Sequence, residues 1–242
     1  MMSRLLREDS PLRCQVIPVT RVKQNCSVIW CAETLRGGVV DPGGEINRVR
    51  AFIDERGIEI ERLLITHSHP DHAGAAAELA EQLAVPIEGP HRAEAAEMTR
   101  MMALAGEHGF DDCRPYRPDR WFEDGDTIPI GHQQLIMLHC PGHTGGHAVY
   151  YCEAANLAFV GDILFRNAIG ATGSAENHLQ LLYSIRRKLF PLGDDVAFVP
   201  GHDALSTFGD ERVFNPYVSD FAAEDYEHIF DDSRYRQSHP LN

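Results

Sequence analysis

Three histidines and one aspartate lie within six residues of each other, in the sequence His67-Ser68-His69-Pro70-Asp71-His72. The apolar run Leu63-Leu64-Ile65 precedes them and belongs to an expected strand over residues 60–66. An alanine-rich stretch with strong helix propensity follows them and ends near Leu83. The cluster therefore lies in a loop between a buried strand and a helix.

The side chains of this cluster are typical metal ligands. Imidazole nitrogens and carboxylate oxygens suit zinc, iron(II) and manganese(II). Alternating residues of an extended loop can direct neighbouring side chains toward different metals, so the spacing predicts two metal sites that share His67, His69, Asp71 and His72. The alternative is a helix N-terminus that Asp71 merely caps, but capping does not require three histidines.

Strand and helix patterns alternate along the whole chain in the order β-rich, α/β, β-rich, α/β. Expected strands cover residues 12–19, 26–32, 38–41, 60–66, 85–88, 134–139, 148–152, 157–160 and 196–199. Expected helices cover residues 45–55, the alanine-rich stretch, 92–104 and 179–189. This order predicts an α/β fold with two related halves, an αββα sandwich in which two mixed β-sheets pack face to face with helices on the outer faces.

The length of 242 residues and the 43% of apolar side chains suffice for one domain with a large core. We therefore expect residues 1–242 to form a single domain. Within it, residues 106–119 are expected to form a polar covering loop, and residues 218–242 a flexible C-terminal tail.

The charge of the chain restricts its partners. The formal net charge of −14 repels a phosphate backbone, which predicts that no nucleic acid is bound. A small anionic substrate is not excluded, because bound metals dominate the local potential in a cleft. No apolar run has the length of a signal peptide or a membrane span, and the six cysteines lack CxxC spacing. We therefore expect a cytoplasmic protein that acts on a small molecule away from membranes; its oligomeric state is not predicted.

Three further segments place a potential ligand after a strand and a tight turn, namely Pro141-Gly142-His143, Gly161-Asp162 and Pro200-Gly201-His202. In isolation, His143 and His202 are interpreted as hydrogen-bonded loop histidines, and the Gly-Asp pair as a turn. Together with the cluster that begins at His67, they extend the predicted ligand set.

Four segments resemble the motifs of the metallo-β-lactamase superfamily and occur in the same order: THSHPDHAG, CPGHTGGH, VGDILF and VPGHD. The resemblance spans the chain from Asp41 to His202. Within that superfamily the chain most resembles the short bacterial glyoxalase II-like hydrolases, through IPVTRVKQNCSVIWCAE, VVDPGG, HCPGHTGGH and RRKLFPLGDDV. The resemblance implies the sandwich fold and two divalent metal ions, for which we expect zinc, with iron or manganese as alternatives.

The resemblance also assigns the ligands to the two metals. It implies that His67, His69 and His143 hold one metal, that Asp71, His72 and His202 hold the other, and that Asp162 bridges both. Two cations about 3.5–4 Å apart share a water and lower its pKa, so a bridging hydroxide is expected to attack a carbonyl carbon. Asp71 and Asp162 are the predicted catalytic residues, and the expected activity is thioester hydrolysis of the hydroxyacylglutathione hydrolase type.

Two residues outside the ligand set also match the family pattern. Asp41 matches a buried aspartate that supports the ligands, although a turn former before Pro42 is an equally good interpretation. His147 also falls at a position where the family often has a histidine, and we expect it to have a structural role.

One loop departs from the family pattern. Glyoxalase II-like proteins typically carry a basic residue in a glycine-rich loop after the bridging aspartate, where this chain has Ala171. That loop helps to hold glutathione in the family, so the natural substrate stays open. The alternatives are a persulfide dioxygenase-like oxidoreductase with a single iron, and a lactone or phosphodiester hydrolase with the same two-metal site. A metal-binding module without activity would be expected to lack a ligand, and none is missing.

Overall fold

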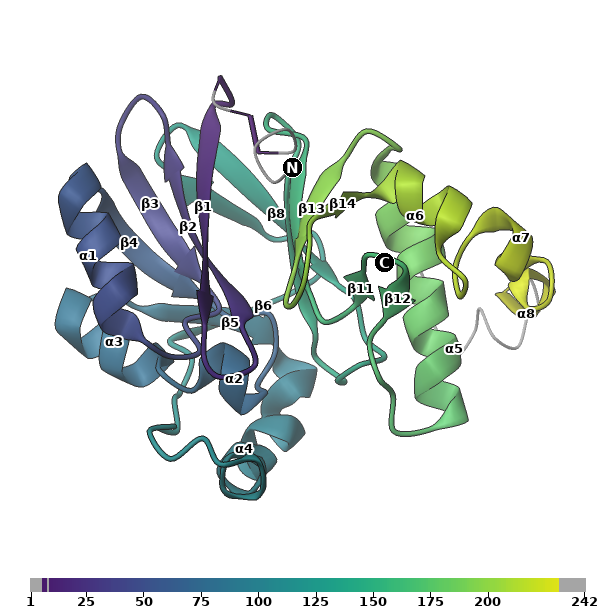
Figure 1. The fold of residues 1–242 in the computed structure, drawn as a ribbon, viewed down its shortest axis with the longest axis horizontal. Coiled ribbons are helices and arrows are strands. Elements are labelled where there is room, and N and C mark those ends of the chain that lie inside the picture. The colour runs from purple at the N-terminus through teal and green to yellow at the C-terminus, as the bar shows by residue number, and fades with distance from the viewer. Residues whose placement is uncertain (1–5, 8, 231–242) are drawn as a thin grey trace.

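A computed structural model describes residues 6, 7 and 9–230, in which two six-stranded sheets pack face to face (Figure 1). The first sheet contains, in spatial order, β1 (Leu12–Val19), β2 (Gln24–Cys31), β3 (Arg36–Val40), β4 (Glu59–Leu64), β5 (Ile87–His91) and β6 (Arg120–Phe122). The pairs β1–β2 and β2–β3 are antiparallel, whereas the pairs β3–β4, β4–β5 and β5–β6 are parallel. The first sheet is therefore mixed, as predicted.

The second sheet is also mixed. It contains, in spatial order, β14 (Ser206–Thr207), β13 (Ala197–Pro200), β10 (Leu157–Gly161), β9 (Ala148–Cys152), β8 (Gln133–His139) and β7 (Thr127–Ile130). Its one parallel pair is β10 with β13. A separate two-stranded ribbon is formed by β11 (Leu164–Phe165) and β12 (Ala168–Ile169).

Helices cover both outer faces of the sandwich (Figure 1). The half that contains the first sheet carries α1 (Ile46–Arg56), α2 (Pro70–Ala73), α3 (Ala76–Leu83), the 3-10 turn η2 (Arg92–Glu94) and α4 (Ala95–His108). The other half carries α5 (Ala175–Tyr183), the π-helical turn η3 (Ser184–Leu189), the 3-10 turn η4 (Phe190–Leu192), α6 (Phe208–Phe214), α7 (Asp220–Ala223) and α8 (Glu227–Phe230). The predicted αββα sandwich is confirmed. Among the described residues, no helix is both long and apolar enough to cross a membrane.

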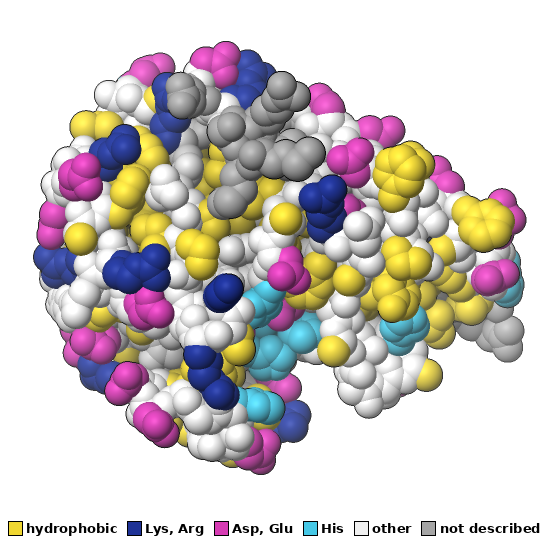
Figure 2. All heavy atoms as spheres, in the orientation of Figure 1, with side chains coloured by type: hydrophobic (Ala, Val, Ile, Leu, Met, Phe, Trp, Pro, Cys, Tyr) yellow, Lys and Arg dark blue, Asp and Glu magenta, His cyan; other side chains and the backbone are white. Residues whose placement is uncertain are grey.

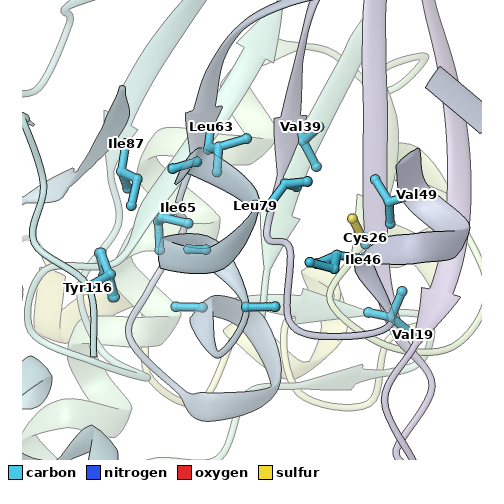
Figure 3. Close-up of a cluster of buried hydrophobic side chains, with 14 of the residues drawn as sticks. Val19, Cys26, Val39, Ile46, Val49, Leu63, Ile65, Leu79, Ile87 and Tyr116 are labelled. Carbon is cyan, nitrogen blue, oxygen red and sulfur yellow. The ribbon is translucent and has the colours of Figure 1, made fainter. Parts of the chain in front are cut away.

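The last two residues of β3 and of β4 are apolar on both faces of the sheet because each face meets another layer. Successive side chains of a strand point to opposite faces of its sheet. Val39 and Leu63 accordingly pack in the outer core beneath α1 and α3 (Figure 3), whereas Val40 and Leu64 pack in the middle core against the second sheet. This double burial fixes the ends of β3 and β4, from which several site residues project.

Some helices of the second half begin or end at residues other than those predicted from the sequence. The helix expected over residues 179–189 begins at Ala175, because the hydroxyl of Ser174 accepts a hydrogen bond from the N–H of Asn177, and it ends as a π-helical turn. The first part of the segment predicted as a flexible tail carries α7 and α8, and Val218, Ala223 and Phe230 are buried there. Residues 231–242 of the predicted tail lie outside the described residues.

Candidate metal centre

All seven predicted ligands lie at one edge of the sandwich, where the strands β4, β8, β10 and β13 end. The residues brought together there are His67, His69, Asp71, His72, His143, Asp162 and His202. Histidine side chains are visible there in a hollow near the middle of the molecular face (Figure 2). Segments far apart in the sequence meet at this edge because these four strands all run toward it.

Three imidazoles form the first group of converging ligands. The Nε2 atom of His67 lies 3.0 Å from Nδ1 of His69, and Nε2 of His143 lies 3.1 Å from the same Nδ1 atom. A carboxylate oxygen of Asp162 completes the group, 3.7 Å from Nε2 of His143. A tetrahedral metal with bonds of about 2.0–2.1 Å separates neighbouring ligand atoms by roughly 3.3 Å. The observed separations fit such a metal.

The second group contains Asp71, His72 and His202. The Nε2 atom of His202 lies 3.1 Å from Oδ2 of Asp71, and Nε2 of His72 lies 3.7 Å from that same oxygen. Asp162 lies between the two groups, since its Oδ1 is 3.3 Å from Nε2 of His72 while its Oδ2 faces His143. Nε2 of His72 and Oδ1 of Asp162 are both buried, and apart from each other they have no hydrogen-bond partner. Buried polar atoms are normally satisfied, so a cation between these atoms fits the arrangement.

Four of the histidines have the Nδ1 atom engaged by the protein, which leaves Nε2 for a metal. His67 pairs with the hydroxyl of Thr66 at 3.0 Å, and His72 pairs with Asp41 at 2.9 Å. His143 donates to the carbonyl oxygen of Ala171 at 2.7 Å, and His202 donates to that of Val22 at 3.3 Å. Each partner fixes the tautomer in which Nε2 carries the free lone pair, which is the usual arrangement of metal-binding histidines.

Asp41 is connected by hydrogen bonds to both groups of ligands, to His72 directly and to His67 through Thr66. Its Oδ1 accepts the N–H of Thr66 at 2.7 Å, and its Oδ2 accepts the Thr66 hydroxyl at 2.6 Å as well as Nδ1 of His72. Since the Thr66 hydroxyl donates to Asp41, its oxygen can accept a hydrogen bond from Nδ1 of His67. Asp41 is 2% exposed and contacts two ligands directly or through one residue. The supporting interpretation of Asp41 is therefore the correct one.

His147 is buried beside the ligands without joining them. Its ring stacks on His67 with centroids 4.7 Å apart, and its Nε2 accepts the N–H of Asp162 at 3.2 Å. This nitrogen is occupied by the backbone, which agrees with the expected structural role. Close packing continues at Gly201, where an added Cβ would overlap the carboxylate of Asp162.

Burial sets the protonation states of the imidazoles. It lowers the pKa of His67 well below the usual range and that of His69 to about 4, so both rings are neutral at pH 7 and suited to ligation. Burial opposes the charged form of His72 as well, but the carboxylates of Asp162 and Asp71 raise its pKa well above the usual value. In the metal-free protein a proton on His72 therefore offsets the carboxylate charge that a cation would offset in the holoprotein.

A cavity of about 310 Å³ opens beside the ligands, and its outer wall comes from residues that the sequence did not single out. Arg21 and Val22 lie in the turn between β1 and β2, while Leu104, His108 and Phe110 come from the end of α4 and the loop after it. The guanidinium carbon of Arg21 lies 5.1 Å from the centroid of the Phe110 ring. Within the described residues, no carboxylate is at ion-pair distance from Arg21, so its charge is available to a bound molecule.

Comparison with known proteins agrees with this geometry. The sequence matches the family described as the metallo-beta-lactamase superfamily over residues 19–202. A Haemophilus influenzae protein named hydroxyacylglutathione hydrolase GloC is 36% identical over 210 residues, which cover 86% of this chain and 99% of the relative.

Two solved structures show the same architecture. The BLEG-1 B3 metallo-beta-lactamase superposes with a TM-score of 0.77 at 26% identity, over 85% of this chain and 99% of that one. TTHA1623, solved in a di-iron-bound form, superposes with a TM-score of 0.75 at 28% identity, over 84% and 99%. The family match covers well over half of the sequence and includes all seven converging residues, so this chain belongs to the metallo-β-lactamase superfamily.

Proposed function

We propose that this chain is a metal-dependent hydrolase that cleaves thioesters, of the hydroxyacylglutathione hydrolase type. The observation that carries the proposal is the complete set of converging ligands, in which four histidines are each held with Nε2 free. The similarity to the Haemophilus influenzae relative along nearly its whole length supports the thioester substrate class. The acidic net charge supports a small-molecule substrate rather than a nucleic acid.

The proposed metals are two divalent cations, for which zinc is our choice and iron or manganese the alternatives. His67, His69 and His143 would hold one of them, and Asp71, His72 and His202 the other, with Asp162 shared. When bound, the two cations supply a water of lowered pKa and polarise the substrate carbonyl.

The residues around the metals bind and orient the reactants. Asp71 is among the residues that line the cavity, where its carboxylate can accept a hydrogen bond from the attacking water or hydroxide and orient it toward the substrate. Val22, Leu104 and Phe110 offer an apolar wall to the acyl or thiol portion, and Arg21 offers a cation to a carboxylate on the same molecule. In this proposal Arg21 supplies part of the positive charge for substrate binding that a basic side chain at position 171 would supply.

A side-chain nucleophile is not part of this mechanism. Cys140 is the thiol nearest to a ligand in sequence, but it is fully buried in the apolar core of the second half. Burial raises the pKa of its thiol to about 12, so it is protonated at neutral pH and weakly nucleophilic. All six cysteines are unpaired, which supports our proposal of a reducing, cytoplasmic location.

The first test is the release of free thiol from S-D-lactoylglutathione by protein of known metal content. We expect turnover by protein that holds two metals, and its loss in Asp162→Ala. The matched control is Asp195→Ala, which removes an exposed carboxylate that accepts a hydrogen bond from the side chain of Asn156 and is not one of the converging ligands. Two metals without turnover would refute the hydroxyacylglutathione assignment and direct the search to other acyl substrates, lactones or phosphodiesters. One bound iron with consumption of oxygen in the presence of a glutathione persulfide would replace the proposal by the dioxygenase alternative.

A further inference from the structure

A buried carboxylate joins the two loops that supply the first group of ligands. Glu94, at the end of η2, is 0% exposed. Its Oε1 accepts the backbone N–H of Ser68 at 2.8 Å, and its Oε2 accepts the backbone N–H of Gly146 at 2.9 Å. Ser68 lies between His67 and His69 in the sequence, and Gly146 follows His143 by three residues. A single side chain therefore ties together the loops that carry all three imidazoles of one site.

The fit around Glu94 is close on both sides. A Cβ added at Gly146 would overlap the backbone of Glu94, so only glycine allows this approach. A second bond joins the same segments, because the N–H of His91 donates to the carbonyl oxygen of Gly146 at 3.1 Å. On the other side the hydroxyl of Ser68 lies 3.0 Å from that of Tyr116. These contacts leave the carboxylate little freedom to move relative to either loop.

No cationic side chain of the described residues pairs with Glu94, so its charge is offset by hydrogen-bond donors, among them the backbone N–H groups of Ser68 and Gly146. Burial raises the pKa of this carboxyl to about 7, although the hydroxyl of Thr144 and the N–H groups of Ser68 and Gly146 act in the opposite direction. A buried, unpaired acid is unfavourable for stability unless every oxygen is well satisfied. Its position therefore indicates a role beyond packing.

The second group of ligands is supported by other residues. Asp41 holds His72, and the carbonyl oxygen of Val22 accepts from His202. Asp71 lies in α2 and pairs with His202. None of the bonds made by Glu94 reaches these three ligands.

We propose that Glu94 is a positioning residue that sets the geometry of the His67, His69 and His143 site and leaves the Asp71, His72 and His202 site unaffected. The proposal rests on the metal centre of the proposed function. Asp41 contacts ligands of both sites, directly or through Thr66, whereas Glu94 contacts only the loops of the first site, so a change at Glu94 is expected to alter the affinity of that site alone. Substitution of such supporting residues typically weakens metal binding about 10- to 100-fold.

The test is a zinc titration of metal-free protein against a chromophoric chelator, with the two sites separated by ligand variants. His202→Ala retains the site served by Glu94, and His143→Ala retains the other. In the His202→Ala background, Glu94→Gln is expected to weaken zinc binding about 10- to 100-fold, because an amide must turn its NH₂ group toward one of the two N–H donors. In the His143→Ala background, the same substitution is expected to change the affinity less than about twofold.

Glu211→Gln is the matched control. Glu211 is also a buried glutamate that accepts a backbone N–H, that of Asn167, and it is 1% exposed. We expect Glu211→Gln to lower the free energy of unfolding without a preference for either zinc site. If Glu94→Gln does not fold, Glu94→Asp keeps the charge on a shorter side chain and is compared in the same two backgrounds.

Equal weakening of both sites by Glu94→Gln, or no weakening of either, would overturn the inference. These outcomes differ from failure of the proposed function, in which unmodified protein would bind no zinc or would bind zinc without cleaving thioesters.

Discussion

Asp41→Asn tests whether one buried carboxylate controls the tautomer of a metal ligand. Asp41 has a φ of 51°, a left-handed conformation that asparagine also adopts readily. The substitution therefore preserves the backbone and the shape of the side chain and changes one oxygen into an NH₂ group. In the native protein Oδ2 accepts from Nδ1 of His72 and from the Thr66 hydroxyl, and Oδ1 accepts from the Thr66 N–H.

Neither orientation of the new amide keeps both native acceptors, the one for Nδ1 of His72 and the one for the N–H of Thr66. With NH₂ toward His72, Nδ1 must become an acceptor, which places the ring proton on the Nε2 atom that faces the metal. With NH₂ toward Thr66, the new amide N–H faces the backbone N–H of Thr66, where the native distance from that nitrogen to Oδ1 is 2.7 Å. A hydrogen bond to a charged group contributes about 1.5–3 kcal/mol, and each 1.4 kcal/mol changes an affinity about tenfold. We expect zinc binding at the site that contains His72 to weaken about 10- to 100-fold.

The measurement is a zinc titration in the His143→Ala background, which keeps the site with His72. Thr66→Val is the contrasting variant, because it removes the hydroxyl that accepts from Nδ1 of His67 and donates to Asp41, while the Asp41 carboxylate and its bond with His72 stay in place. We expect Thr66→Val to weaken the other site, measured in the His202→Ala background. If Asp41→Asn binds zinc at the His72 site with unchanged affinity, the tautomer argument is refuted. It is also refuted if Asp41→Asn and Thr66→Val weaken the same site to the same extent.

Two further substitutions separate substrate binding from stability. Arg21→Ala is expected to raise KM for an anionic thioester about fivefold with kcat unchanged, since an exposed ion pair contributes up to about 1 kcal/mol. The measurement is steady-state kinetics, with Arg166→Ala, which removes an exposed loop arginine, as the control. An equal rise of KM in Arg166→Ala would contradict the prediction. Tyr150→Phe removes a buried hydroxyl that donates to the carbonyl oxygen of Ile65 at 2.7 Å. We expect a loss of about 1–3 kcal/mol in the free energy of unfolding by urea, and a loss of bound metal instead of stability would show that Tyr150 serves the site.

The candidate ligands could be named from the sequence because each lies in a short segment at the end of a strand, and because these segments resemble the motifs of the superfamily. His67 to His72 follow β4 directly, and His143 and His202 follow Pro-Gly turns. Their meeting in space needed only the fold, which the alternation of strand and helix patterns predicted. Asp41 was ambiguous, since its positive φ and its place before Pro42 also suit a turn, and only the contact with His72 decides between the two interpretations.

Glu94 and Arg21 could not be predicted because their contacts join segments that are distant in the sequence. Glu94 reaches Ser68 across 26 residues and Gly146 across 52. A glutamate at the start of a helix is ordinarily a solvent-exposed residue that suits the helix dipole, so its type carries no signal of burial. Arg21 lies in a hairpin turn, where a charged residue is equally ordinary.

The helices near the C-terminus did leave a local signal. Thr207 accepts from the N–H of Asp210 at the start of α6, and Ser219 accepts from that of Ala222 at the start of α7. Both are N-caps of a preferred type followed by acidic residues, a pattern that indicates a helix start. The short strands β6 and β14 carried no comparable signal, since three and two residues are too few to show alternation.

In the loop that contains Ala171, the backbone and not the side chain supports a candidate metal ligand. The support that position 171 gives to His143 comes from its backbone carbonyl oxygen, at 2.7 Å from Nδ1, and does not depend on the side chain. Val22 supports His202 in the same way through its carbonyl oxygen. A basic side chain at position 171 can therefore be absent without loss of a ligand's orientation. Because Val22 and its neighbour Arg21 also line the cavity, changes in this turn can alter which substrate is bound while its backbone continues to hold His202.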